Sequence, residues 1–453
     1  MRKLRFLSLV ITICLLFSAV SPCAFALNAP EIKSARSVLV GDIDSGRILY
    51  AENAYTRSEP ASITKIMTML LAVEAVERGE ASLDDMVTAS ENCNFDLTED
   101  SSTSNIYPGE VMSLNDLLYC AALASANEAC NIIAEHISGS TEAFVAKMNE
   151  RAEQLGCSGT HFANTHGLPD PEHYTTAHDL FLIAREAMTH EQFAKLCGTA
   201  TYTTTETNSA NARTLQNSNA LINANSVYGN HYVYKDAKGI KTGHTSAAGY
   251  CLVSAAERNG VKLIGVVLGA AGDMENGEYF NNFDDSITVL DWVFDNFSYR
   301  TLVSTEDIVG SQPVIKTFRQ GKINLKPTEE ISALVPNDIN VYQLKKEIKL
   351  YDDSVSSAEE GLELGEMTLS DTDGTVLGTV KLVAAGDIIY SKDADGGENT
   401  QQKGLSDMQK NAILIVCAIL LFIVIIVAMA MVRRRRYIKA RRRRIERQKR
   451  GGR

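Results

Sequence analysis

The sequence predicts an α/β fold in which helices pack on an antiparallel sheet, followed by a small all-β domain and one transmembrane helix. Apolar residues at helical spacing fill much of the interval 62–189, between an early hairpin and a later run of strands. Over residues 300–392, short apolar runs alternate with polar turns rich in Gly and Asp. A long uncharged stretch then follows near the end of the 453-residue chain.

The first predicted elements are a hairpin and a helix. Over residues 36–54, two apolar runs flank the turn signal Asp44-Ser45-Gly46. A helix is expected from about Ser62 to Arg78, directly after Pro60, because apolar residues there recur at helical spacing: Ile66, Met69, Leu70, Val73 and Val76. Gly79 is typical of the residue that ends a helix.

A second helix is expected to begin at Ser113, because Asp116 three positions later gives a start that resembles a capping box. This helix would place Ser125 near its end, where a side chain can face a cleft. Further helices are predicted at about 127–137, 141–155 and 177–189.

Strand patterns replace helical ones after about residue 230. Residues 239–243 lead one strand, and residues 250–256 and 261–268 predict a hairpin across Asn259-Gly260, the strongest short turn signal. A final helix at about 285–297 contains the only tryptophan, Trp292. These elements define a first domain at 27–299, a small all-β domain at 300–392 and a polar linker at 393–410.

Both ends of the chain carry targeting signals. Residues 1–26 read as a signal peptide, with a basic start, an apolar run and the cleavage-like Ala24-Phe25-Ala26; an uncleaved anchor is the alternative. Residues 411–432 predict a transmembrane helix, since Ala412 to Val432 is uncharged. The basic segment 433–453 would then be a cytoplasmic tail, with the body on the outer side of a single-pass cell-membrane protein.

Charge is distributed very unevenly. The net charge is −12, yet 13 Lys/Arg and one Glu follow Val432, so the body before the membrane segment is strongly acidic. That argues against nucleic acid as a partner of the body. The body contains six cysteines whose pairing the sequence does not determine: Cys93, Cys120, Cys130, Cys157, Cys197 and Cys251.

Three short strings fit one reaction. They are Ser62-Ile63-Thr64-Lys65, Ser125-Ala126-Asn127 and Lys241-Thr242-Gly243, spaced 63 and 116 residues apart. Each string alone is common and usually has no function, but the ordered set, with Pro60-Ala61 before the first serine, indicates a serine acyl-transfer site.

The residue types explain the chemistry. On a helix, positions i and i+3 share a face, so the Lys65 amine can take the proton of Ser62 when Lys65 is neutral. Burial and a second cation, Lys241, would lower its pKa into the required range. Ser125 can relay a proton to a leaving amine, and Asn127 can bind a peptide group.

The third string and its neighbours would bind substrate. Lys241 and Thr242 suit a terminal carboxylate by charge and by hydroxyl, and Gly243 leaves room for substrate along the strand edge. The backbone N–H groups of Ser62 and His244 are the expected oxyanion donors.

These strings give the chain a resemblance to D-alanyl-D-alanine carboxypeptidases, the low-molecular-mass penicillin-binding proteins. The resemblance covers about residues 34–300 and includes Pro60 to Thr68, Phe162 to Leu168 and Lys241 to Tyr250. It implies a β-lactamase/transpeptidase-like sandwich and a serine peptidase that removes the terminal D-alanine from peptidoglycan pentapeptide. It also implies Ser62 as acyl-ester nucleophile, Lys65 as base, Ser125 as relay and Lys241 as carboxylate contact, with covalent trapping by β-lactams.

Two other functions remain open at this stage. A β-lactamase would need a deacylating base, for which Glu172 and Glu206 are candidates in loops. A membrane-anchored sensor of β-lactams or of the cell wall would signal through the tail. The middle residue of the second motif, Ala126, differs from the Gly of many family members, and the true transmembrane span differs from their amphipathic anchor.

No metal or cofactor is expected. Four histidines cluster in the sequence, but their spacing does not match common metal motifs, and loop or capping roles are favoured: His161, His166, His173 and His178. For Glu128, a solvated or capping role at a helix start is preferred to that of a general base.

Overall fold

The computed structural model describes residues 28–99, 101–273, 279–316 and 319–390. The predicted signal peptide, linker, transmembrane helix and tail lie outside these ranges. Among the helices in the described ranges, none combines the length and the apolar character that a membrane crossing requires.

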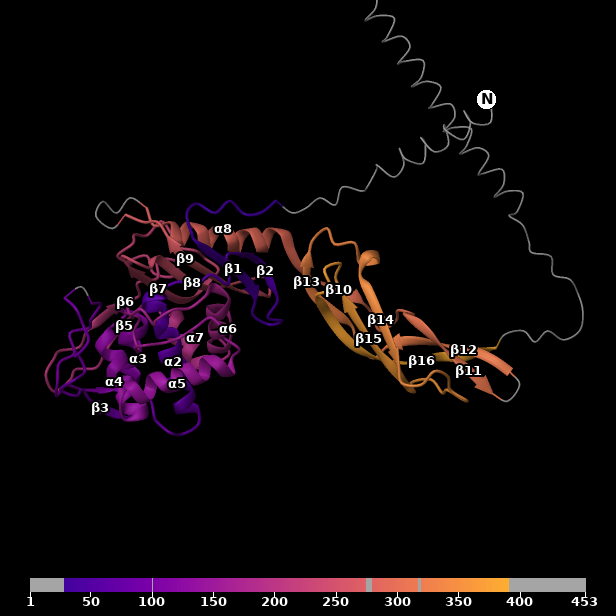
Figure 1. Ribbon diagram of the computed structural model, residues 1–453, viewed down its shortest axis with the longest axis horizontal. Helices are drawn as coiled ribbons and strands as arrows, with labels where there is room; N and C mark the ends of the chain where they lie inside the picture. The colour runs from indigo at the N-terminus through magenta and orange to yellow at the C-terminus, as the bar shows by residue number, and fades with distance from the viewer. Residues whose placement is uncertain (1–27, 100, 274–278, 317–318, 391–453) are drawn as a thin grey trace, which may run out of the picture. The chain divides into compact units, whose positions relative to one another are not determined.

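A five-stranded antiparallel sheet forms the centre of residues 28–273 (Figure 1). The strand order is β2-β1-β9-β8-β7, so the first and last parts of this region pair in the middle of the sheet. The strands are β1 (Ser37–Asp42), β2 (Ile48–Glu52), β7 (Ala237–Thr245), β8 (Gly249–Arg258) and β9 (Val261–Ala270). The two predicted hairpins, β1–β2 and β8–β9, are confirmed. Asn259 and Gly260 have φ of 53° and 80°, which the tight turn requires.

The sheet is covered on both faces, because successive side chains of a strand point to opposite sides. Leu39 and Val253 belong to a core shared with the helices between residues 65 and 198. Val38 and Leu252 lie on the other face and pack with Val289 of the helix α8 (Asn281–Asn296). Figure 1 shows α8 lying along the sheet and the other helices gathered on its opposite side. The predicted sandwich of helices and antiparallel sheet is therefore present.

The helices between β2 and β7 follow the prediction closely, with two corrections at the motifs. Ser113 and Thr176 accept hydrogen bonds from Asp116 and Asp179, as expected of capping residues. The helices are α2 (Lys65–Glu77), α3 (Leu114–Ala122), α4 (Asn127–Ser138), α5 (Thr141–Gln154), α6 (Ala177–Ala187) and α7 (Glu191–Gly198).

The corrections concern the serines of the first two motifs. Ser62 lies in a 3-10 turn, η1 (Ala61–Thr64), and not in the α-helix itself. Ser125 lies beyond the end of α3, in the loop before α4, with a left-handed φ of 58°. The helix α7 and the short pairs β3 (Met86–Thr88) with β4 (Val111–Ser113) and β5 (Thr201–Thr203) with β6 (Thr214–Gln216) were not predicted.

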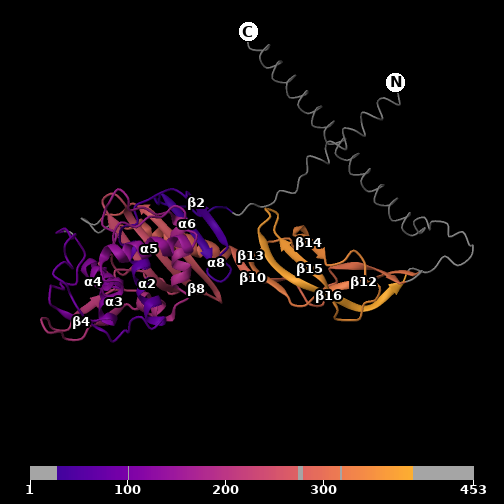
Figure 2. The ribbon, with the colours of Figure 1, turned by 60° about the horizontal axis from the view of Figure 1, so that its bottom comes forward.

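The region after α8 is built of strands. Those strands are β10 (Phe297–Val303), β11 (Gly310–Lys316), β12 (Arg319–Pro327), β13 (Ile331–Pro336), β14 (Lys345–Leu350), β15 (Glu363–Ser370) and β16 (Val376–Tyr390), with a 3-10 turn η2 (Val341–Gln343). β14, β15 and β16 are neighbours in one antiparallel sheet, and Figure 2 shows them side by side.

The chain forms two compact units whose boundaries differ from those of the predicted domains. Its first compact unit includes Asn324–Asp353 and Glu359–Gly386 with the residues before Pro313, and its second includes Pro313–Ile323 and Ser354–Ala358. The boundary at 299/300 therefore stays a prediction.

Candidate active site

The first motif forms a compact pair. The Nζ atom of Lys65 lies 2.9 Å from the Oγ atom of Ser62. The 3-10 turn explains this short distance, because residues i and i+3 eclipse one another in that geometry. Ser62 is partly exposed and Lys65 is fully buried. The reactive hydroxyl can thus meet a ligand while the amine stays away from water.

The other contacts of Lys65 suit a neutral amine. Its Nζ lies 2.7 Å from Oδ1 of Asn127 and 2.7 Å from the carbonyl oxygen of His166. Both oxygens can only accept, so they take the two hydrogens of a neutral amine. The remaining lone pair then faces the Ser62 hydroxyl, which can donate. Burial lowers the pKa of Lys65 from 10.5 to about 8, which makes this neutral form accessible near physiological pH.

Lys241 belongs to the same buried cluster as Lys65. It is 1% exposed, and its Nζ donates to the carbonyl oxygen of Thr242 over 3.0 Å. Burial, followed by the positive charge of Lys65, lowers its pKa to about 7. The residues lining the hollows beside Ser62 do not include Lys241. The direct contact of Lys241 with a substrate carboxylate stays a prediction.

The second motif contributes from the loop before α4. Ser125 is 7% exposed, and its Oγ has no hydrogen-bond partner among the described residues. Asn127 begins α4, and its amide oxygen is already occupied by Lys65, so its amide NH₂ is left for a ligand. Ala126 is buried, which agrees with a middle residue that adds no side-chain chemistry.

Two hollows meet at Ser62. One has a volume of about 400 Å³ and is lined by Ser125, Ser218 and, from the third motif, Thr242 and Gly243, among others. The other, of about 480 Å³, is lined by Asn127 and by residues of the segments 166–169 and 244–247. Ser62, Ser102 and His244 line both hollows. The three motifs that the sequence singled out therefore converge on one cleft.

The glycines of this region have a packing role that the sequence did not indicate. A Cβ at Gly243 would lie 3.1 Å from the carbonyl oxygen of Pro60 and 3.2 Å from the amide of Ile63, so it points at η1 and not along the open strand edge. Gly167 has a φ of 96°, and a Cβ there would overlap with the carbonyl of Ala61. Both glycines let backbone pack directly against the turn that carries Ser62.

Two of the four clustered histidines form hydrogen bonds with residues of the first motif. His173 accepts a hydrogen bond from the amide of Ala163 at Nδ1, so its Nε2 donates to Oγ1 of Thr64 over 2.7 Å. Burial lowers its pKa to about 3. His166 places its carbonyl on Lys65 and bonds to Asp96 through Nε2 over 2.8 Å. Loop positions were expected, but this burial beside the site was not.

The remaining sequence candidates serve local structure. His161 bonds to the carbonyl of Glu172, and His178 lies 3.3 Å from Asp179. Glu128 is fully buried, which corrects the expected solvated role. Its Oε1 accepts from the amides of Ser104 and Ile106, so it does cap a loop. The six body cysteines are free and buried.

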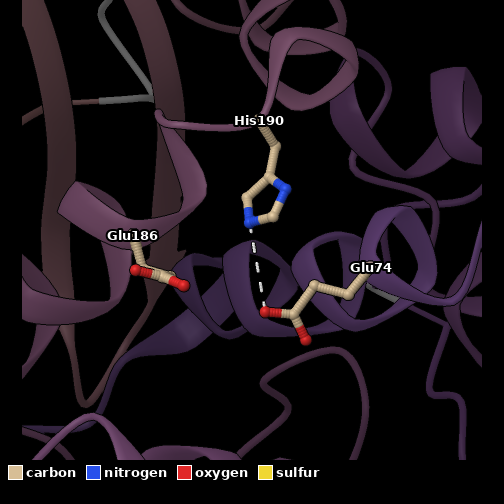
Figure 3. A group of neighbouring side chains, drawn as sticks. All are labelled: Glu74, Glu186 and His190. Atoms are coloured by element: carbon tan, nitrogen blue, oxygen red, sulfur yellow. Dashed lines mark ion pairs between the residues drawn. The ribbon is translucent and has the colours of Figure 1, made fainter. Parts of the chain in front are cut away.

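One group of side chains has the composition of a metal site. Figure 3 shows Glu74, Glu186 and His190 facing one another. However, the guanidinium of Arg151 lies 2.7 Å from Glu74 and 2.6 Å from Glu186, so each carboxylate already has a cationic partner. His190 pairs with Glu77 over 2.7 Å. The group is therefore an ion-pair network with a structural role.

Sequence reasoning missed Ser102 and Ser218, both of which line the cleft. Neither belongs to a recognisable string, and serines in loops carry no distinctive signal. The Asn-rich segment 216–225 that surrounds Ser218 was the available hint, because Asn side chains often fix tight turns.

Comparisons with known proteins agree with this geometry. Residues 24–272 match the peptidase S11 family, described as D-alanyl-D-alanine carboxypeptidase. The D-alanyl-D-alanine carboxypeptidase DacF of Bacillus subtilis is 35% identical over 373 residues, which cover 81% of this chain and 90% of the relative. DacC of Escherichia coli is 30% identical over 394 residues, or 85% and 89% of the two chains.

Solved structures give the same result for the fold. Penicillin binding protein 5 of Haemophilus influenzae matches with a TM-score of 0.62 at 28% identity, covering 80% of this chain and 99% of that one. A mutant of Streptomyces K15 DD-transpeptidase matches with a TM-score of 0.51 at 30% identity, covering 59% and 100%. The predicted transpeptidase-like α/β fold is confirmed, and the chain belongs to the D-alanyl-D-alanine carboxypeptidase family.

Proposed function

We propose that the chain removes the terminal D-alanine from peptidoglycan stem peptides through an acyl-enzyme on Ser62. The observation that carries this proposal is the contact of the Lys65 amine with the Ser62 hydroxyl, while two oxygens that only accept take its other positions. Neutral Lys65 receives the hydroxyl proton as Ser62 Oγ attacks the carbonyl carbon of the penultimate D-alanine. The amides of Ser62 and His244 are the proposed oxyanion donors.

The leaving amine must gain a proton as its C–N bond breaks. Ser125, whose Oγ has no partner in the described structure, is the proposed relay: its hydroxyl gives a proton to that nitrogen and takes the proton that Lys65 received from Ser62, so Lys65 is neutral again. Free D-alanine departs and leaves an ester between Ser62 and the shortened peptide. Water then attacks the ester carbonyl, with Lys65 again as base, and restores the Ser62 hydroxyl. β-Lactams would acylate Ser62 by the same first step.

The structure offers no support for the alternative of a β-lactamase. Neither Glu172 nor Glu206 lines the hollows beside Ser62, and both are exposed. In the described part of the chain, no Asp or Glu lines either hollow. A penicilloyl ester on Ser62 should therefore lack a carboxylate to activate water, and we expect it to be long-lived.

The activity is tested with the full-length chain in detergent and the tripeptide diacetyl-L-Lys-D-Ala-D-Ala. We expect release of free D-alanine at a rate that saturates with substrate. After exposure to benzylpenicillin, intact mass spectrometry should show one adduct that persists for many turnover times of the peptide reaction. Absence of D-alanine release would refute the proposed activity, and rapid turnover of penicillin would favour a β-lactamase.

We also propose the topology that the sequence predicts: export directed by residues 1–26, anchoring by a helix at 411–432 and a cytoplasmic tail at 433–453. The support is the uncharged stretch followed at once by arginines. Protease added to intact cells should degrade the body and leave a short, membrane-protected fragment that carries a C-terminal epitope tag. Loss of the tag in intact cells would contradict this orientation.

A further inference from the structure

Glu128 is a buried carboxyl group that the proposed mechanism does not use. It lies in the first turn of α4, directly after Asn127 of the second motif, and it is fully buried. Its Oε2 atom accepts no hydrogen bond from any other described residue. Burying a carboxyl group in this way is costly, so its position next to the second motif calls for an explanation.

One role of Glu128 is to fasten a segment of the chain to α4. Its Oε1 accepts hydrogen bonds from the amide of Ser104 over 2.6 Å and from the amide of Ile106 over 3.3 Å. Next to it, the amide of Asn127 donates to the carbonyl of Ser102 over 2.9 Å. Three hydrogen bonds from two successive residues therefore hold this segment along the first turn of α4.

The fastened segment borders the reacting centre. Ser102 lines both hollows that meet at Ser62. Asn127, on the same turn of α4, holds the amine of Lys65 through its amide oxygen. The positions of this cleft wall and of the proposed base therefore depend on the same few contacts, and a small displacement there should lower kcat/KM.

A second role of Glu128 is electrostatic. Lys65 and Lys241 are both fully buried, and the positive charge of the first acts on the second. Burial lowers the pKa of Lys65 to about 8, and the negative charge of Glu128 opposes this effect. Burial raises the pKa of Glu128, while its amide donors and the charge of Lys65 favour the ionised form. The positive end of α4 favours that form as well.

The other titratable groups around these residues do not supply the same balance. Four thiols are neutral, because burial raises the pKa of each to about 11 or 12. Two imidazoles are neutral near physiological pH, because burial lowers their pKa. Asp96 bonds to one of these imidazoles, and Arg213 pairs with Glu110. The thiols belong to Cys93, Cys120, Cys130 and Cys197, and the imidazoles to His166 and His173.

We propose that Glu128 is a positioning residue for the acyl-transfer reaction: its carboxylate fixes residues 102–106 to α4, and its negative charge balances the buried ammonium of Lys65. This inference rests on the proposed function, because it takes Lys65 as the base. Two substitutions separate the two roles. Glu128→Gln keeps the length and one acceptor oxygen but loses the charge. Glu128→Asp keeps the charge but is one methylene shorter, so it cannot reach both amides.

The first variant tests the electrostatic role through the pH profile of D-alanine release by the full-length chain. In Glu128→Gln, the ammonium of Lys65 loses a stabilising charge, so Lys65 becomes neutral at lower pH. We expect the rising limb of kcat/KM to move down by about 0.5 to 1 pH unit. Glu135→Gln removes a charge from the same helix, at a half-buried position bonded to Ser90, and should leave the limb in place. An unmoved limb in Glu128→Gln, or an equal movement in the control, would overturn this role.

The second variant tests the fastening role. In Glu128→Asp, we expect kcat/KM to fall about 10- to 100-fold at every pH, with the rising limb near its wild-type position. A wild-type rate would refute the fastening role, and a limb displaced as in Glu128→Gln would refute the electrostatic role. Because this variant bears on both roles, it decides the proposal even if Glu128→Gln does not fold.

The two proposals fail in distinguishable ways. If the wild type releases D-alanine and both variants match it in rate and in pH profile, the role of Glu128 is wrong although the acyl-transfer chemistry holds. If the wild type releases no D-alanine from the tripeptide at any pH, the proposed function itself is wrong.

Discussion

Replacement of Ser62 by alanine is expected to lower kcat for D-alanine release by about 10⁴-fold or more. The reason is that Oγ of Ser62 is the only hydroxyl that the Lys65 amine contacts, so no neighbouring group can take its place as the activated nucleophile within the described structure. The variant should also lose the penicillin adduct. The measurement is D-alanine release under saturating tripeptide, with intact mass spectrometry on the same samples.

Folding must be unaffected for this result to be informative. Ser62 is partly exposed, and the change removes one oxygen without adding atoms, so the melting temperature should stay within a few degrees of the wild type. A Ser62→Ala variant that is folded and still releases D-alanine within tenfold of the wild-type rate would remove Ser62 from the mechanism.

The substitution Lys65→Arg is expected to lower kcat/KM by about 10²- to 10⁴-fold at every pH. An arginine keeps the positive charge and the donors, but it does not deprotonate in proteins and cannot accept the Ser62 proton. The change therefore separates a role as base from a role as hydrogen-bond donor. Lys262→Arg, at a half-exposed position outside the cleft, is the matched control and should be neutral.

The dependence of kcat/KM on pH tests the role of Lys65 as a base in the wild type. Burial lowers the pKa of Lys65 to about 8, and burial together with the charge of Lys65 lowers that of Lys241 to about 7. Because Lys65 is active when neutral, kcat/KM should rise with pH between about 6 and 8 and level off above, as the coupled pair loses its proton. Lys65→Arg should be uniformly slow with no such rise. A wild-type rate that falls over this interval would exclude a neutral lysine base.

Much of the fold could be predicted because local patterns decide it. The spacing of Ile66, Met69 and Val73 determined α2, and Asn259-Gly260 determined the β8–β9 hairpin. The 3-10 turn at Ser62 could not be predicted, since it depends on the packing of Gly167 and Gly243 against it from distant parts of the chain. The three-residue strands β3 to β6 were missed because three residues are too few to show the alternation of apolar and polar side chains that marks a strand.

The candidate site could be predicted where its residues belong to short sequence motifs. The strings brought Ser62, Lys65 and Lys241 into one hypothesis, and the fold does gather their elements at one cleft. The motifs could not indicate which of their side chains are buried. The sequence predicted that Lys241 supplies a cation, but it did not predict that the surrounding chain encloses Lys241 and that its Nζ donates to the carbonyl of Thr242. The supporting roles of His166 and His173 depend likewise on contacts about 100 residues away in sequence.

The most direct test of the mechanism is to locate the covalent adduct. The full-length protein is acylated with benzylpenicillin, digested and sequenced by tandem mass spectrometry. The account predicts the penicilloyl group on Ser62 in the wild type and no adduct in the Ser62→Ala variant. An adduct on any other residue, Ser125 included, would contradict it.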